Sequence, residues 1–395
     1  MTSALKSSPS IATRREIPFG KPIIGDAERE AVMAVMRGST LTHGPRVKEF
    51  EAAFAAFTGA PYALAVSNCT AALHLAYLFA GIGPGDEVIV PAQTHVATAH
   101  AVELCGGTCV FLDSEQRTGN IDIDQLESRI TNRTKAIAVV HYLGLPVDMT
   151  RVLAIAQRRE LLVIEDCALS LGATLNGTHP GLHGDIGCFS FYPAKHITTG
   201  EGGMIITRRD DLARQAAMQR AFGIDRNVVS DRAAPGQYDV QMLGSNYRMS
   251  EMAAAIGVEQ MKRLPGILVD RRANFDMLAS GLGELDEIQL LQSTGGRCIS
   301  SCYCLNLLLK HTIRDRRSEI VKNLSSRGIG TSVYYPSPVP AMTYYRQKYA
   351  MDARDFPVAA MLSDSGIALP VGPHVSPDDI RFIIASVKDA LSVVV

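Results

Sequence analysis

Seven short apolar runs in the first half of the chain constrain its fold more than any other feature. Helical stretches separate several of them, among them residues 70–79 and residues 149–158, for which Asp148 is a suitable N-cap. Strands that alternate with helices argue for a mostly parallel sheet covered on both faces. The predicted strands are residues 62–66, 87–91, 108–112, 135–140, 161–165, 187–192 and 203–207.

The pattern changes after Thr207, where helical and charged stretches dominate. Residues 250–282 predict a long connecting helix with a break at Pro265, because proline removes a helix hydrogen bond. A smaller α/β unit follows, with a strand at 302–309 and helices at 314–327 and 377–391. We therefore predict a mobile N-terminal tail over residues 1–17, a large domain over 18–260 and a small domain with its connecting helix over 261–395.

The composition excludes several classes of protein. The chain has 395 residues, of which 47% are hydrophobic and 20% charged, as in a globular protein with a sizeable core. With 39 basic and 40 acidic residues, it offers no electrostatic case for binding nucleic acid or an anionic membrane. No apolar run reaches the length of a membrane span, and the N-terminus lacks the apolar core of a signal peptide. The eight cysteines lack zinc-site spacing, so we expect a cytoplasmic protein with free thiols and no metal.

Lys195 is the leading candidate for chemistry. It lies in a loop between two predicted strands, where an amine can attack a carbonyl compound to form a Schiff base. Most lysines are solvated surface charges, so this position alone is a weak signal. It gains weight from four other elements in the same half of the chain.

The first two elements can hold an anion. Cys69 and Thr70 open a helix, and free backbone N–H groups at a helix start favour a phosphate, although an ordinary N-cap explains the same pattern. Ser190, five residues before Lys195, can aim its hydroxyl at that phosphate or simply fill a tight core position.

The other two elements suit a flat, nitrogen-containing ring. His95 follows a predicted strand, at the end of a parallel sheet where ligands bind, and can stack on a ring or bond a neighbouring carbonyl. Glu165 and Asp166 end another strand, and a buried carboxylate needs a partner such as a pyridinium nitrogen. Either of the two acids can instead be structural.

Together these elements resemble the DegT/DnrJ/EryC1/StrS sugar aminotransferases, within fold type I of the pyridoxal-phosphate enzymes. The resemblance extends from about Pro18 to the last helix. It implies a mostly parallel seven-stranded sheet with a smaller C-terminal α/β domain. The matching segments are residues 41–45, 67–73, 83–88, 163–166, 184–187, 189–203, 245–249 and 328–331.

The resemblance also implies a role for each residue. Lys195 would form the Schiff base with pyridoxal 5'-phosphate, Asp166 would pair with its pyridine nitrogen, and His95 would stack on its ring. Ser190 and the backbone at Cys69 and Thr70 would hold the phosphate. Asn246 would cross a dimer interface to the neighbour's phosphate, which implies a homodimer with shared active sites. Candidate substrate contacts are Arg248 and Tyr335.

Two positions depart from the family pattern. Leu169 replaces the usual Gln or His near the cofactor's ring hydroxyl, and the change Leu169→Gln is expected to be tolerated. Tyr334 replaces a histidine that many relatives carry, which bears on the substrate contacts.

The function implied is transfer of an amino group from glutamate to a keto group of a nucleotide-linked sugar. His196 and the glycine-rich run that follows are similar to those of members acting at C4 of 4-keto-6-deoxy sugars, including the branch that leads to pseudaminic-type sugars. Three alternatives remain: a keto-cyclitol aminotransferase, a cofactor-dependent sugar dehydratase, and a non-enzymatic regulator that binds the cofactor. Lys195 argues against the dehydratase, whose relatives carry histidine there.

Overall fold

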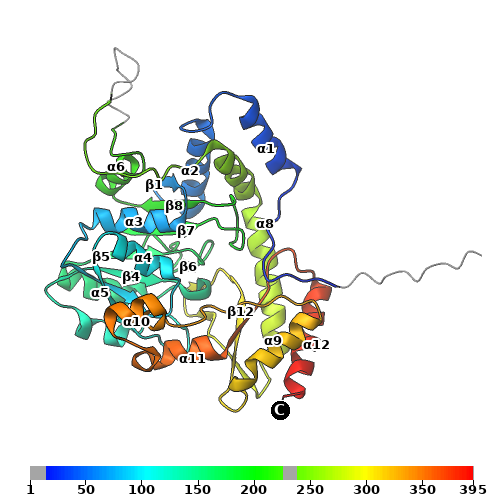
Figure 1. Cartoon of the computed structure of the whole chain (residues 1–395). Coiled ribbons are helices and arrows are strands. Elements are labelled where there is room, and N and C mark those ends of the chain that lie inside the picture. The colour runs from blue at the N-terminus through cyan, green and yellow to red at the C-terminus, as the bar shows by residue number, and fades with distance from the viewer. Residues whose placement is uncertain (1–14, 226–237, 395) are drawn as a thin grey trace, which may run out of the picture.

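The computed structural model describes residues 15–225 and 238–394 and contains a seven-stranded sheet at its centre (Figure 1). The strand order is β1-β8-β7-β5-β4-β2-β3, in which β8 runs antiparallel to both β1 and β7 and the other neighbours are parallel. The predicted mostly parallel seven-stranded sheet is therefore confirmed. Its strands are β1 (Tyr62–Val66), β2 (Glu87–Pro91), β3 (Thr108–Leu112), β4 (Thr134–Val140), β5 (Leu162–Asp166), β7 (Ile186–Ser190) and β8 (Gly203–Thr207).

Alternate residues of each strand point to opposite faces of this sheet, and helices bury both faces. Val88, Ala136 and Ile164 pack in one core with helices α3 (Cys69–Phe79), α4 (Val96–Leu104) and α6 (Asp210–Gln219). Their neighbours Ile89 and Val163 pack on the opposite face against α5 (Met149–Arg159). Farther along that second face lie α2 (Pro45–Thr58) and α8 (Glu251–Leu282). As predicted, Asp148 caps α5, by accepting a hydrogen bond from the Arg151 N–H.

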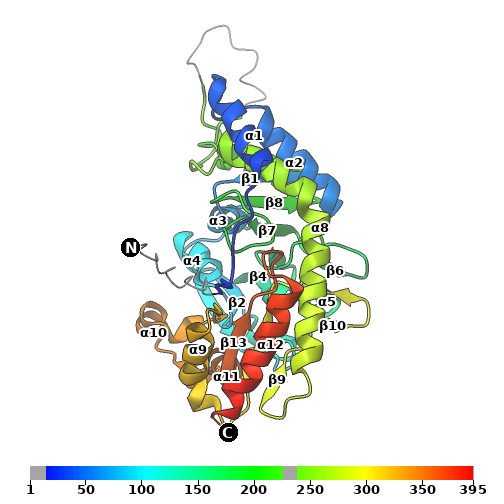
Figure 2. The same cartoon turned by 90° about the vertical axis from the view of Figure 1, so that its right-hand side faces the viewer.

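The long helix α8 continues through Pro265, so the expected break is wrong. Figure 2 shows it running along the molecule from the large sheet to the C-terminal elements. Met261 and Leu264 before the proline and Ile267 after it all pack in one core. That burial holds the helix together across the missing hydrogen bond. The predicted domain boundary near residue 260 falls inside this helix.

The C-terminal part of the chain builds a second core around a three-stranded antiparallel sheet in the order β13-β12-β9. Ile17 is buried in this core and pairs with Ile329, although the predicted tail extended to residue 17. The strands are β9 (Ile288–Leu290), β12 (Leu305–Leu309) and β13 (Gly366–Leu369), and the helices are α9 (Arg317–Ser326), α10 (Thr343–Tyr349), α11 (Pro357–Ser365) and α12 (Pro377–Ser392). Helix α1 (Asp26–Arg37) packs on α8, and a small sheet joins β6 (Thr174–Leu175), β10 (Thr294–Gly295) and β11 (Cys298–Ile299).

Strand β1 lies at one edge of the large sheet, and two side chains bind its free backbone groups. The Ala65 N–H donates to the Glu51 carboxylate over 2.8 Å. The Ala65 carbonyl accepts from Arg220 over 2.7 Å, and Arg220 also pairs with Glu51 over 2.5 Å. The polar groups of this edge residue are thus satisfied without another strand.

Among the described residues, no helix is both long and apolar enough to cross a lipid bilayer.

Candidate active site

Lys195 lies in the connection between the antiparallel strands β7 and β8. Bonds across its base close this loop, from the Phe191 N–H to the Gly202 carbonyl over 2.9 Å and from the Thr199 N–H to the Phe191 carbonyl over 3.0 Å. The side chain is half-buried, and its amine lies 5.3 Å from the ring centroid of Tyr303. Burial lowers the pKa of the Lys195 amine, while Cys69, Asp166 and Cys304 act in the opposite direction. A lowered pKa increases the share of unprotonated amine that can act as a nucleophile.

Asp166 and Glu165 point to opposite faces of the sheet, as neighbours on a strand must. Asp166 faces α4, where Thr98 donates its hydroxyl to Oδ2 over 2.8 Å, while the Ala168 N–H donates to Oδ1 over 3.1 Å. A carboxylate has about four acceptor positions, so Asp166 keeps capacity for a further donor. That spare capacity in a buried group suits the protonated nitrogen of a pyridine ring.

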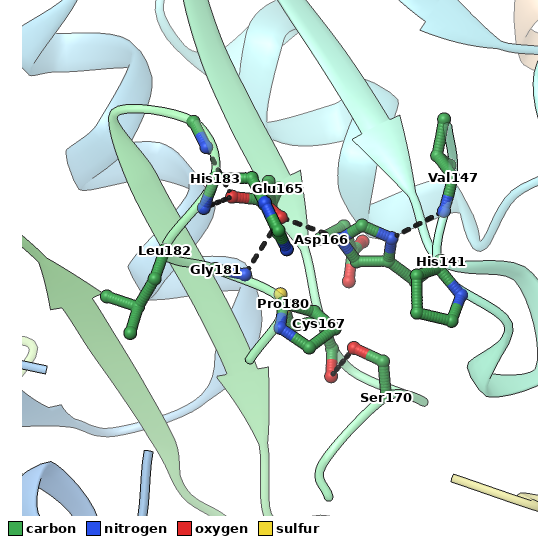
Figure 3. A network of polar contacts seen from close by, with 12 residues as sticks. His141, Val147, Glu165, Asp166, Cys167, Ser170, Pro180, Gly181, Leu182 and His183 are labelled. Atoms are coloured by element: carbon green, nitrogen blue, oxygen red, sulfur yellow. Dashed lines mark hydrogen bonds and ion pairs between the residues drawn. The ribbon is translucent and has the colours of Figure 1, made fainter. Parts of the chain in front are cut away.

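The Glu165 carboxylate is fully occupied by protein donors (Figure 3). Oε1 accepts the N–H groups of His183 and Gly184 over 2.9 and 2.6 Å, and Oε2 accepts from Gly181 and from His141 Nε2 over 2.8 and 2.9 Å. His141 Nδ1 accepts the Val147 N–H, so Nε2 carries the proton given to Glu165. Although Cys167 lies close to this pair, four donors leave the carboxylate no free position for a metal ion.

The start of α3 can hold a phosphate. Asn68 caps this helix by accepting the Ala71 N–H over 2.8 Å, and the N–H groups of Cys69 and Thr70 have no partner within the helix because they lie in its first turn. Strand β8 approaches this point so closely that a Cβ on Gly203 would lie 2.5 Å from the Asn68 carbonyl carbon. Ser190 ends β7 opposite Gly203, on the face that carries Asp166. The donors that the sequence suggested for a phosphate therefore lie together at the carboxyl ends of β1 and β7.

His95 and Tyr335 come together from distant parts of the chain. His95 caps α4 through Nδ1, which accepts the Ala97 N–H over 3.2 Å, and its ring centroid lies 5.9 Å from that of Tyr335. Burial lowers the pKa of His95, so its ring is neutral over most of the neutral range. A neutral ring can stack on an electron-poor aromatic ring without a charge penalty.

Asn246 and Arg248 lie beside the end of β1, where Val66 pairs with Arg248. Asn246 is exposed, and its amide oxygen accepts from Arg248 Nε over 2.9 Å. Arg248 also lines a surface hollow of about 740 Å³ together with residues of α2, β1 and α6. Lys195, Asp166, His95 and Tyr335 are not among its lining residues. Asn246 and Arg248 thus belong to an outer surface of this chain.

The surroundings of Leu169 and the contact of Tyr303 with Lys195 were not predicted from the sequence. Leu169 is 1% exposed and packs with Tyr142, Tyr303 and Tyr335, so its surroundings are apolar and phenolic. Tyr303, which contacts Lys195, was missed altogether. No local motif marks it, since it reaches the site only because the segment just before β12 lies against Lys195 and His196.

A family model for the DegT/DnrJ/EryC1/StrS aminotransferases matches residues 22–388. The chain belongs to this family. It is similar to GDP-perosamine synthase of Caulobacter vibrioides, with 36% identity over 95% of this chain and 98% of that one. Among solved structures it resembles the putative sugar aminotransferase Spr1654 of Streptococcus pneumoniae in its PMP form, with TM-score 0.91, 27% identity and coverage of 96% of this chain and 100% of the other. Helicobacter pylori PseC, an aminotransferase involved in the biosynthesis of pseudoaminic acid, gives a TM-score of 0.88 at 26% identity, with the same coverage of both chains.

The protein is therefore an enzyme, a sugar aminotransferase that depends on pyridoxal phosphate. Its residues fit that cofactor: an amine on Lys195, a buried carboxylate with spare acceptor capacity on Asp166, and N–H groups at the start of α3 that have no partner within the helix. A regulator without catalytic activity is excluded by the family.

Proposed function

We propose that this enzyme transfers an amino group from glutamate to the C4 keto group of a nucleotide-linked 4-keto-6-deoxy sugar. The observation that carries the proposal is that Lys195 and Asp166 lie at the carboxyl ends of β7 and β5, near enough for Asp166 to affect the pKa of the Lys195 amine, and that the first turn of α3 offers N–H groups without a partner in the helix. The similarity to GDP-perosamine synthase supports a nucleotide-linked substrate. The similarity to PseC supports the branch leading to pseudaminic-type sugars.

Each residue has a defined task in this mechanism. Pyridoxal phosphate, when bound, supplies the carbonyl that takes up the amino group and an electron-poor ring that stabilises negative charge at the neighbouring carbon. Asp166 would accept the N–H of the pyridine ring and keep it protonated. Lys195 would carry a proton between the substrate carbon and the cofactor, and the first turn of α3 with Ser190 would hold the phosphate. His95 would cover one face of the ring, and Tyr335 beside it would contact the sugar.

We also propose a homodimer in which Asn246 and Arg248 serve the neighbour's site. The exposure of Asn246, and the position of Arg248 in a surface hollow that Lys195 does not line, support this arrangement. Arg248 would bind the diphosphate of the substrate, because a guanidinium pairs well with phosphate oxygens. On dilution, we expect an Asn246→Ala variant to lose its cofactor and the parent protein to retain it. A fully active monomer would refute the proposed shared site.

Kinetics with a panel of keto substrates tests the substrate class. The nucleotide-linked keto sugar should give a far higher kcat/KM than the same sugar without its nucleotide, because remote binding energy is used at the reacting carbon. The Lys195→Ala variant, with its fold checked by circular dichroism, should show no turnover on any of them. Equal efficiency on the free sugar, or preference for a keto-cyclitol, would overturn the proposed substrate while leaving the aminotransferase intact.

A further inference from the structure

The segment 301–303 of the small domain lies against the loop that carries Lys195. His196, the next residue after the lysine, bonds the Ser301 carbonyl through Nε2 over 3.2 Å, and its ring centroid lies 5.7 Å from that of Tyr303. The Lys195 amine lies 5.3 Å from the Tyr303 ring centroid. A cation within about 6 Å of a phenol ring centroid, over its face, is attracted by the ring's negative face. Both residues of the Lys195–His196 pair therefore contact this one segment.

Tyr303 is itself held at three points. Its hydroxyl bonds the Tyr334 hydroxyl over 2.7 Å, and its carbonyl accepts from Arg271 of α8 over 3.0 Å. Its ring is 3% exposed and meets the Tyr334 ring edge-on at 5.3 Å. A side chain fixed in this way presents one ring face to the lysine without losing further conformational entropy.

We infer that Tyr303 is a positioning residue whose ring face holds the protonated amine of Lys195 whenever that amine is free of the cofactor. The inference rests on the proposed role of Lys195 as proton carrier. Burial disfavours the charged amine, and Asp166 of β5 opposes that effect. Cys69 and Cys304 would oppose it only as thiolates, and burial raises the pKa of both thiols. The Tyr303 ring adds stabilisation of the ammonium from the small-domain side.

The test measures the ionisation of Lys195 directly, in enzyme loaded with pyridoxamine phosphate so that the lysine is free. The pH dependence of Lys195 acylation, read by mass spectrometry of its peptide, gives the pKa of the amine. Tyr303→Phe keeps the ring and should leave this pKa nearly unchanged. Tyr303→Leu should lower it by roughly half a unit to one and a half units.

Fluorination provides a version of the test that keeps the shape of the side chain. Phenylalanine and its mono-, tri- and pentafluorinated forms at position 303 progressively weaken the negative ring face, so the pKa of Lys195 should fall stepwise along the series. A purely structural role for Tyr303 predicts the same pKa throughout. A flat series would overturn the inference even if Tyr303→Leu failed to fold.

This readout is independent of the proposed substrate. Absence of turnover on every keto sugar would refute the proposed function, but the role of Tyr303 would still be supported by the pKa series. Conversely, an active enzyme with a flat series would retain its proposed function and lose only the role of Tyr303.

Discussion

Replacing Glu165 with glutamine should destabilise the fold although the two side chains have nearly the same shape. The carboxylate accepts four buried hydrogen bonds, two at each oxygen. Glutamine replaces one oxygen with an NH₂ group, so whichever way the amide turns, two N–H groups of the protein face a donor. Each buried donor left without an acceptor costs about 1–3 kcal/mol, which gives about 2–6 kcal/mol. Removing a buried negative charge offsets part of this cost, so we expect a loss of about 2–4 kcal/mol.

The assay is urea unfolding followed by circular dichroism, at fixed protein concentration and saturating cofactor. Glu319→Gln serves as a matched control, because Glu319 is exposed and its ion pair with Arg316 is a surface contact that should contribute little. The Glu165 variant should unfold at clearly lower urea concentration than both the parent and this control. Unfolding of all three proteins at the same urea concentration would refute the reasoning.

The pH dependence gives a second check on the same carboxylate. Burial alone would raise the pKa of Glu165, but the hydrogen bonds from His141 and from the N–H groups of Gly181 and Gly184 lower it below its ordinary value of 4.5. A depressed pKa in the folded state means that the stabilisation is complete above the unfolded value and is lost as the pH falls through the folded one. The stability gap between parent and Glu165→Gln should therefore be constant above about pH 5 and should narrow in more acidic solution.

Substitutions of Gly203 and Leu169, each with a control variant, test the packing of the site. Gly203→Ala should lower the free energy of unfolding by about 1–3 kcal/mol and weaken cofactor retention, since its Cβ would meet the backbone of Asn68. Gly266→Ala, at an exposed position of α8 with no atom near the new Cβ, should instead raise the free energy of unfolding by about 1 kcal/mol, because alanine favours a helix more than glycine does. Equal effects of the two glycine substitutions in unfolding experiments would contradict this interpretation of Gly203. Leu169→Gln was expected to be tolerated, but the burial of Leu169 changes that expectation. Leu169→Gln should lower the free energy of unfolding by about 1–3 kcal/mol, measured by thermal or urea unfolding, and Leu169→Met should lower it much less. Parent-like stability of the glutamine variant would mean that its amide finds hydrogen-bond partners.

The strands and the site residues along them were predictable because their signals are local. Apolar runs placed each strand of the large sheet to within about two residues, since parallel strands buried on both faces leave a continuous hydrophobic signature. The positions of Asp166 and Ser190 follow from strand alternation. The course of α8 through Pro265 did not follow, because packing against the sheet outweighs the local preference.

The partners of the site residues depend on contacts between segments far apart in the chain. The sequence left open which of Glu165 and Asp166 was structural; the difference lies in the backbone N–H groups of the 181–184 loop, which turn toward Glu165 only in the folded chain. Tyr303 reaches Lys195 only through the folding of a segment more than one hundred residues further along the chain, and no spacing rule connects the two.

The ion pair of Glu51 and Arg220 at the edge of the large sheet has a consequence for how copies of this protein can associate. An edge strand with free N–H and C=O groups is a template for strand addition and aggregation. Here the Ala65 N–H and carbonyl are already bonded by those two side chains, so an incoming strand would have to displace a salt bridge before it could pair. Loss of either charge would expose the Ala65 groups, although Val66 beside them would still pair with Arg248. The first symptom would be self-association on storage at high concentration, with catalysis still intact.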